Sequence, residues 1–157
     1  MSFDDAVARL LGEEGGYTND SRDAGGETKY GISRAAYPSV DIASLTLDGA
    51  KAIYKRDYWD ALRCDELPPR IAAALFDSAV NSGRGPATRW LQQALNVTAD
   101  GVIGPATIQA AKQAAGDAEG VLMRFFGYRL RMLADLATWP AFGRGWARRV
   151  ARNLISG

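Results

Sequence analysis

The sequence predicts a mainly α-helical protein, a helical bundle with a small β-hairpin lobe near the N-terminus. Apolar residues recur at helical spacing near both ends of the chain, in residues 3–11 and 121–133. Residues 17–32 instead combine aromatic and β-branched residues with Asn-Asp and Gly-Gly pairs, which is typical of a hairpin or an irregular β-lobe. Proline-containing helix starts recur in the second half of the chain. Together these patterns favour an α+β protein dominated by helices.

The first half of the chain carries recognisable helix boundaries. Ser2 and Asp5 have the spacing of a capping box, and the helix that follows is expected to end at Gly15-Gly16. Thr46 is a good N-cap for a helix that continues through Tyr58. Pro68-Pro69 predicts the start of a further helix over 71–81, which Gly83 should end.

Helix signals also organise the second half. Residues 85–88 and 104–107 share the sequence Gly-Pro-Ala-Thr, a helix start with proline in the first turn. The last third predicts two helices joined at Thr138-Trp139-Pro140. No long linker or low-complexity segment divides the 157 residues. We therefore expect all the predicted elements to form one compact molecule, which is expected to be a monomer.

Composition excludes several classes of enzyme. The chain contains no histidine, which removes the usual zinc hydrolases and the Ser-His and Cys-His nucleophile systems. Its single cysteine, Cys64, cannot form an intramolecular disulfide. Catalysis would have to use carboxylates, hydroxyls, lysine or backbone groups, and we expect neither a metal nor an organic cofactor.

The two halves of the chain differ in charge. Residues 1–80 hold 9 Lys and Arg against 14 Asp and Glu, a net charge of −5, whereas residues 81–157 hold 10 against 4, a net charge of +6. An arginine-rich surface would attract an anionic polymer. The acidic first half and the lack of a basic-aromatic recognition motif argue against nucleic acid. A solvated helix face would explain the same arginines.

The segment 14–32 holds the candidate catalytic groups. Glu14 is expected at the end of the first helix, where the helix dipole and apolar neighbours such as Tyr17 or Tyr30 would favour a protonated carboxyl group. Asp23 follows nine positions later in a polar, glycine-rich turn and should stay ionised, and Thr28 could help it to orient a water molecule. An acid paired with an ionised carboxylate is what glycoside hydrolysis usually requires. Glu14 as a plain helix-end residue and Asp23 as a turn former are the structural alternative.

The segment resembles a known enzyme family. Glu-Gly-Gly-Tyr at 14–17, followed by Asn-Asp, Asp23, Gly-Gly, Thr28 and Tyr-Gly-Ile at 30–32, is similar to the signature of the glycoside hydrolase family 108 N-acetylmuramidases of bacteria and phages. Residues 47–59, 76–83 and the segment from Leu91 also resemble that family. The resemblance implies a lysozyme-like fold, peptidoglycan glycan strands as substrate and Glu14 as catalytic acid. The order Glu, Asp, Thr also resembles the phage-type lysozyme triad, although there the threonine lies one residue farther on.

The resemblance also suggests how the chain is divided. Residues 1–88 would form the muramidase catalytic region, and 89–157 a helical region similar to a peptidoglycan-binding motif, packed with the first as one unit. Asp77 and Asn81 lie one helical turn apart and either line the cleft and bind sugar amides or form a buried polar bracket that ties the helix to the hairpin. The candidate substrate-binding residues are Tyr17, Asn19, Tyr30, Asp77 and Asn81.

The leading hypothesis is therefore an N-acetylmuramidase that cleaves the β-1,4 bond between N-acetylmuramic acid and N-acetylglucosamine during cell-wall lysis, as an endolysin does. A lytic transglycosylase with one catalytic glutamate, a chitin- or chitosan-cleaving enzyme, and a non-catalytic wall-binding or phage structural module are the alternatives. The N-terminus lacks a signal-peptide profile and no apolar run suits membrane insertion. We expect synthesis in the cytoplasm and action on the cell wall or periplasm after delivery by a holin or a secretion system.

Overall fold

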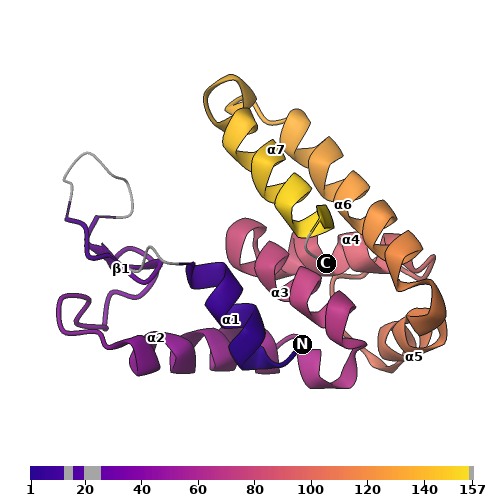
Figure 1. Ribbon diagram of the computed structural model, residues 1–157, viewed down its shortest axis with the longest axis horizontal. Helices are drawn as coiled ribbons and strands as arrows, with labels where there is room; N and C mark the ends of the chain where they lie inside the picture. The colour runs from indigo at the N-terminus through magenta and orange to yellow at the C-terminus, as the bar shows by residue number, and fades with distance from the viewer. Residues whose placement is uncertain (13–15, 20–25, 156–157) are drawn as a thin grey trace. The chain divides into compact units, whose positions relative to one another are not determined.

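The computed structural model describes residues 1–12, 16–19 and 26–155 and divides the chain into two compact units (Figure 1). One unit is Ser2–Asp57, and the other begins at Tyr58 and holds the remaining helices. Glu14 and Asp23 lie outside the described residues, and the structural account concerns the elements on either side of them.

The first helix, α1 (Phe3–Leu11), begins as the sequence predicts and ends earlier. Ser2 and Asp5 form the capping box: the Ser2 backbone N–H donates to Asp5 Oδ2 at 2.8 Å, and the Asp5 N–H donates to Ser2 Oγ. The predicted end at Gly15-Gly16 is wrong, because Gly12 already adopts a φ of 56° and ends the helix after Leu11. A residue in this backbone region stops helix propagation, and glycine adopts it without steric cost.

The hairpin predicted within residues 17–32 is present and short. Strands β1 (Thr28–Lys29) and β2 (Ile32–Ser33) pair antiparallel, with Thr28 opposite Ser33 and Lys29 opposite Ile32. Tyr30 and Gly31 connect them with φ values of 52° and 76°, the two positive values of a type I′ turn. A Cβ atom on Gly31 would lie 2.6 Å from the Tyr54 hydroxyl oxygen, so glycine is required there by both conformation and space.

Helix α2 (Leu47–Tyr54) completes the first unit. Thr46 is its N-cap, as predicted, and accepts a hydrogen bond from the Gly49 N–H at 3.1 Å. The helix continues without a break into a π-helical stretch, Lys55–Asp60. The buried apolar side chains of this unit come from α1, the hairpin, the following loop and α2, and include Val7, Ile32, Ile42 and Ile53.

The second unit is built from helices. After a 3-10 turn at Cys64–Glu66 come α3 (Pro69–Ser82), α4 (Arg84–Ala94), α5 (Pro105–Gln113), a 3-10 turn at Ala114–Asp117, α6 (Ala118–Ala134) and α7 (Trp139–Ile155). Gly83 ends α3 as predicted, with a φ of 91°. Trp139 and Pro140, expected in the connection between the last two helices, instead form the first turn of α7, where proline needs no N–H partner.

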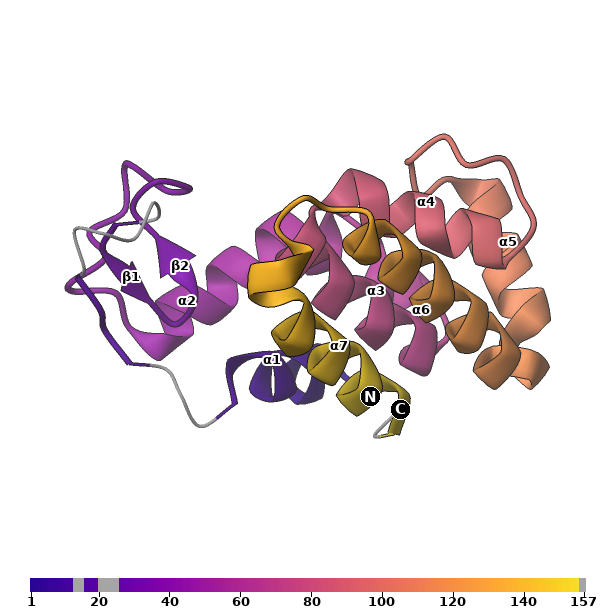
Figure 2. The same ribbon diagram turned by 90° about the horizontal axis from the view of Figure 1, so that it is seen from above.

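Helix α6 is at the centre of this unit. It packs against α3, α4 and α7, and Figures 1 and 2 both show α6 and α7 side by side. Phe125 on α6 is fully buried and makes edge-to-face contacts with Trp90 and Phe126, at centroid distances of 6.3 and 5.1 Å. The prediction of a mainly α protein with a small N-terminal hairpin is confirmed. Across the described segments, no helix combines the length and apolar character needed to cross a bilayer.

Candidate functional site

The described residues on either side of the predicted catalytic carboxylates belong to α1 and to the hairpin lobe. Glu14 follows the end of α1 by three positions in the sequence, and Asp23 falls between Asn19 and Gly26. The sequence predicted Glu14 at the end of the first helix, but α1 ends at Leu11, and the field of a helix end decays within about one turn. The roles of Glu14 and Asp23 stay predictions.

Thr28 lies where the chain enters the hairpin. Its N–H and C=O both pair with those of Thr18 at 2.8 Å, and its hydroxyl donates to the Gly26 carbonyl at 3.1 Å. The bridge brings residues 18 and 28, which flank Asp23 in the sequence, into direct contact. With its hydrogen engaged, the Thr28 oxygen keeps lone pairs that can accept a hydrogen bond from water or a sugar hydroxyl.

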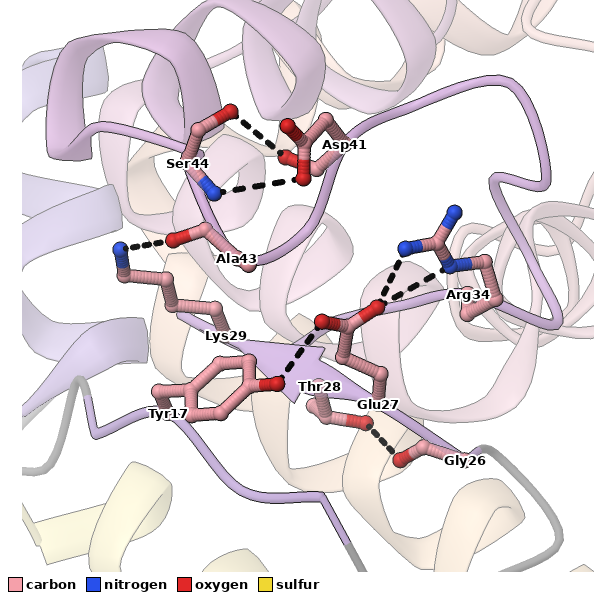
Figure 3. A network of polar contacts seen from close by, with 9 residues as sticks. All are labelled: Tyr17, Gly26, Glu27, Thr28, Lys29, Arg34, Asp41, Ala43 and Ser44. Carbon is pink, nitrogen blue, oxygen red and sulfur yellow. Dashed lines mark hydrogen bonds and ion pairs between the residues drawn. The ribbon is translucent and has the colours of Figure 1, made fainter.

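A polar network in the hairpin lobe consists of Tyr17, Glu27 and Arg34. Of these three residues, the sequence indicated only Tyr17. The Tyr17 hydroxyl donates to Glu27 Oε1 at 2.8 Å, while the Arg34 guanidinium donates to Glu27 Oε2 through both Nε, at 3.1 Å, and Nη2 (Figure 3). Arg34 and Tyr17 together hold the pKa of Glu27 below its usual value, and the bond to Glu27 raises the pKa of Tyr17. Glu27 therefore stays ionised and holds the Tyr17 side chain. The register of the hairpin could have indicated this pair, but Glu27 is not among the residues on which the family resemblance rests, and Arg34 lies beyond the 14–32 segment.

The lowered pKa of Glu27 predicts a pH effect on the hairpin lobe. Its stabilising contribution should be complete above the usual pKa of 4.5 and should be lost as the pH falls through the lower, folded-state pKa. In Glu27→Gln, the hairpin lobe should already be less stable at neutral pH, and its stability should fall less as the pH is lowered. Amide hydrogen exchange of Thr28 and Arg34, whose N–H groups donate to the Thr18 and Glu27 carbonyls, measures this across a pH series, after correction for the intrinsic pH dependence of exchange. Identical pH profiles for the two proteins would contradict the prediction.

The other predicted binding residues of the lobe are Asn19 and Tyr30. Asn19 is exposed and directly follows Thr18, which pairs with Thr28. Tyr30 occupies the hairpin turn, where its carbonyl accepts a 2.9 Å hydrogen bond from the Tyr54 hydroxyl and its ring lies 5.7 Å from Lys29 Nζ. Tyr17, Asn19, Thr28 and Tyr30 are thus gathered in one lobe, which is where a sugar-binding surface for the catalytic segment is expected.

Lys29 connects the hairpin to the loop before α2, and Asp41 makes contacts within that loop. Lys29 Nζ donates to the Ala43 carbonyl at 2.9 Å, and Asp41 accepts a hydrogen bond from the Ser44 N–H (Figure 3). The hydrogen bonds from Ser44 hold the pKa of Asp41 below its usual range. The Lys29 contact holds the hairpin to this loop, and the Asp41 contact stabilises the loop itself.

Asp77 and Asn81 lie on α3 in the second unit and have protein partners. Asp77 Oδ2 accepts hydrogen bonds from Arg129 Nη1 at 3.1 Å and from Asn153 Nδ2 at 2.7 Å, and its Oδ1 lies 3.4 Å from Arg149 Nη1. Asn81 Nδ2 donates to the Asp77 carbonyl at 2.7 Å. These contacts join α3 to α6 and α7, so Asp77 forms a polar bracket among helices, whereas the sequence had suggested a bracket between the helix and the hairpin. Sugar binding by this pair stays a prediction.

The segment similar to a peptidoglycan-binding motif contains a second bracket. Gln92 is fully buried, and its Nε2 lies within hydrogen-bond distance of Asp100 Oδ1 at 2.6 Å, of the Val102 carbonyl and of Thr107 Oγ1. Its Oε1 accepts from the Gly101 N–H at 2.9 Å. The turn at Asp100-Gly101 is therefore fixed from within by a side chain of α4, and these residues have a structural task whether or not the turn contacts the wall.

Comparison with known proteins identifies the family. The family model described as Glycosyl hydrolase 108 matches residues 7–83, and the model described as Predicted Peptidoglycan domain matches residues 86–151. The solved structure of SagA from Brucella abortus is similar to the whole chain, with a TM-score of 0.86 and 33% sequence identity over 98% of this chain and 92% of that one. The chain belongs to the glycosyl hydrolase 108 family. Comparison with curated proteins gave no match.

Membership of the glycosyl hydrolase 108 family confirms the resemblance and the lysozyme-like fold class predicted from the motifs. The chain is a glycoside hydrolase that acts on peptidoglycan. The stretch matched by the glycosyl hydrolase model holds Glu14, Asp23 and Thr28 together with the hairpin lobe and the whole of α3. Within the described parts of the chain, no group of three or more Cys, Asp or Glu side chains is placed to hold a metal ion.

Proposed function

We propose that this glycosyl hydrolase 108 protein is an N-acetylmuramidase that cleaves the β-1,4 bond between N-acetylmuramic acid and N-acetylglucosamine and so lyses bacterial cell walls as an endolysin does. Glu14 donates a proton to the glycosidic oxygen, and ionised Asp23 either activates water or stabilises the positive charge that develops on the sugar. Residues 1–88 carry out this reaction, and residues 89–157 hold the wall polymer.

The observation that carries the proposal is the pairing of Thr18 with Thr28. The sequence between these residues contains Asp23, and the bridge fixes both ends of that segment by two 2.8 Å hydrogen bonds. Thr28, the third member of the Glu-Asp-Thr order, thus has a defined position at the start of β1, with a hydroxyl oxygen that can accept a hydrogen bond. Catalytic groups need such positioning, because small displacements of a reacting group cost large factors in rate.

The hairpin lobe supports substrate binding next to this segment. Tyr17, Asn19 and Tyr30 present two aromatic rings and an amide, the groups that stack on sugar faces and bond to N-acetyl groups. Tyr17 is 46% exposed and is held by Glu27, which reduces the conformational entropy that binding would cost.

Asp23→Asn separates this proposal from a lytic transglycosylase, which needs only one catalytic glutamate. The variant should lose most of its activity on purified sacculi, at least about 10²-fold if Asp23 acts as a general base. Mass spectrometry of the wild-type digest should show reducing muramic acid ends. Asp48→Asn, which removes the same charge from an exposed position in the first turn of α2, serves as the control and should digest sacculi normally.

Two outcomes would contradict the muramidase proposal. Anhydro-muramyl products, with a rate that tolerates Asp23→Asn, would identify a transglycosylase. Binding to sacculi without release of soluble fragments would identify a wall-binding module.

A further inference from the structure

The second unit contains a pocket that the proposed reaction does not use. Its volume is about 380 Å³, and it lies between the C-terminal end of α3, the second half of α6 and the middle of α7. This volume is within the range of small-ligand sites. Arg129 and Arg149 contribute to one part of its lining, and Leu133, Leu136 and Trp146 to another. A pocket with these two kinds of lining suits a ligand that has an anionic end and an apolar body.

The charges of the two arginines are not balanced by the acidic groups that they contact. Within the described part of the chain, Asp77 is the acidic side chain bonded to either guanidinium, and it contacts both, at 3.1 and 3.4 Å. One carboxylate thus faces two guanidinium groups. Burial lowers the pKa of Arg129, although the Asp77 carboxylate opposes this effect. One further negative charge would therefore be electrostatically favourable here.

Arg129 also has hydrogen-bonding capacity that its protein partners do not use. Its side chain is 3% exposed, and its hydrogen bonds to Asp77 and to Ser78 both use Nη1. Its Nε is buried without a hydrogen-bond partner among the described residues. The Nε–H and Nη2 edge of a guanidinium is the fork that binds a carboxylate with two parallel hydrogen bonds. A buried N–H left without a partner is costly, and a bound carboxylate would remove that cost.

The remaining lining indicates a peptide carboxylate. Asn81 donates through Nδ2 to Asp77, which leaves its Oδ1 as an acceptor for a peptide N–H. Leu133 is buried, Leu136 is 39% exposed, and Trp146 stacks with Trp139 and Phe142 at centroid distances of 6.2 and 5.9 Å. Leu136 thus lies where the pocket meets solvent, and a small apolar side chain next to a carboxylate would fit against these residues.

We propose that this pocket binds the C-terminal carboxylate of a short peptide that ends in a small apolar residue, with the carboxylate on Arg129 and Arg149 and the last side chain against Leu136 and Trp146. The identity of the natural peptide rests on the proposed function: in a peptidoglycan hydrolase it is a stem peptide ending in D-alanine. The pocket would then select the peptide part of the wall, while the hairpin lobe binds its sugars.

Peptide titrations followed by ¹H–¹⁵N NMR test this proposal, with the Arg129 Nε–H and the Trp146 indole N–H as reporters. The probe is acetyl-L-Ala-D-isoGlu-L-Lys-D-Ala, compared with the same peptide carrying a C-terminal amide. The acid should shift both signals saturably, and the amide should bind at least about tenfold more weakly, since it loses a charge-assisted bidentate contact. Equal shifts with acid and amide, or no saturable shift with the acid, would overturn the proposal.

Variants at the edge of the pocket avoid removing the buried arginine. Leu136→Glu places a carboxylate at the mouth of the pocket and should abolish binding, and Arg149→Gln should weaken it about tenfold. Met123→Glu likewise replaces an apolar side chain by a carboxylate, at a 69% exposed position of α6 outside the pocket, and should bind as the wild type does. Unchanged binding by Leu136→Glu, with native amide spectra, would overturn the proposal.

Two further measurements are needed. The first distinguishes a peptide carboxylate from a simple fatty-acid carboxylate, and the second distinguishes failure of the pocket proposal from failure of the muramidase proposal. Hexanoate that binds as tightly as the peptide would overturn the assignment to a peptide, because it offers only a carboxylate and an apolar chain. Sacculus digestion is measured on the same samples. Saturable binding of the peptide acid without digestion would support the pocket and refute the muramidase, whereas digestion without peptide binding would refute the pocket alone.

Discussion

Glu14→Gln is expected to reduce the rate of sacculus digestion by about 10²–10⁴-fold or more, the usual contribution of a general acid. The amide has nearly the same shape as the carboxyl group but has no acidic proton to give to the glycosidic oxygen. Because the substitution is nearly isosteric, the fold should persist. Turbidity loss and product release from sacculi measure the rate, and circular dichroism and thermal melting measure the fold.

Glu13→Gln is the matched control, since it removes the same charge one position earlier in the sequence. It should digest sacculi at close to the wild-type rate. If Glu14→Gln kept more than about a tenth of the wild-type rate, well above the residual activity of an enzyme without its general acid, the assignment would be wrong. Equal losses in both variants would contradict the assignment of the general acid to Glu14 over Glu13.

Asp77→Asn is expected to cause a large loss of stability. The substitution leaves Arg129, whose side chain is 3% exposed, without its charge partner, and it also weakens the contacts to Arg149 and Asn153. Breaking a buried ion pair from one side costs about 3–5 kcal/mol. Because Asp77 is 17% exposed, we expect the lower end of that range. For a domain of this size, a loss of about 3 kcal/mol corresponds to a fall in Tm of roughly 10 °C.

Glu119→Gln provides the comparison. Glu119 pairs with Arg70 at 3.4 Å but is 80% exposed, and such surface pairs contribute about 0–1 kcal/mol. The double variant Asp77→Asn/Arg129→Met should recover part of the lost stability, because it removes the buried charge that lacks a partner. Equal small shifts in Tm for Asp77→Asn and Glu119→Gln would show that the bracket does not hold α3, α6 and α7 together.

Much of the fold could be predicted because its signals are local. The Ser2–Asp5 capping box, the Thr46 cap and the Gly83 stop each involve residues within one turn of a helix boundary. Local sequence therefore specifies their hydrogen bonds and backbone angles. The end of α1 shows the limit of such reasoning: glycines occur at 12, 15 and 16, and sequence alone does not say which of them adopts the positive φ that stops the helix.

The sequence motif of the candidate site could be predicted, but the hydrogen-bond network around it could not. The order of Glu14, Asp23 and Thr28 within a glycine-rich segment indicated the family, which the comparisons confirm, while the roles of these residues stay predictions. Glu27 and Arg34 were missed because their contact depends on how the hairpin and the following turn place side chains seven positions apart. The same contact orders Tyr17, which the motif had indicated by itself.

The sequence by itself determined the helix boundaries with local caps, the position of the hairpin and the family. Only the tertiary structure decided what Asp77 does, because its partners Arg129, Arg149 and Asn153 lie 52, 72 and 76 positions away. The spacing of Asp77 and Asn81 along α3 is the same whether Asp77 binds a sugar at the surface or lies between two guanidinium groups. Burial and long-range charge pairing distinguish the two cases, and both arise only when distant helices pack together.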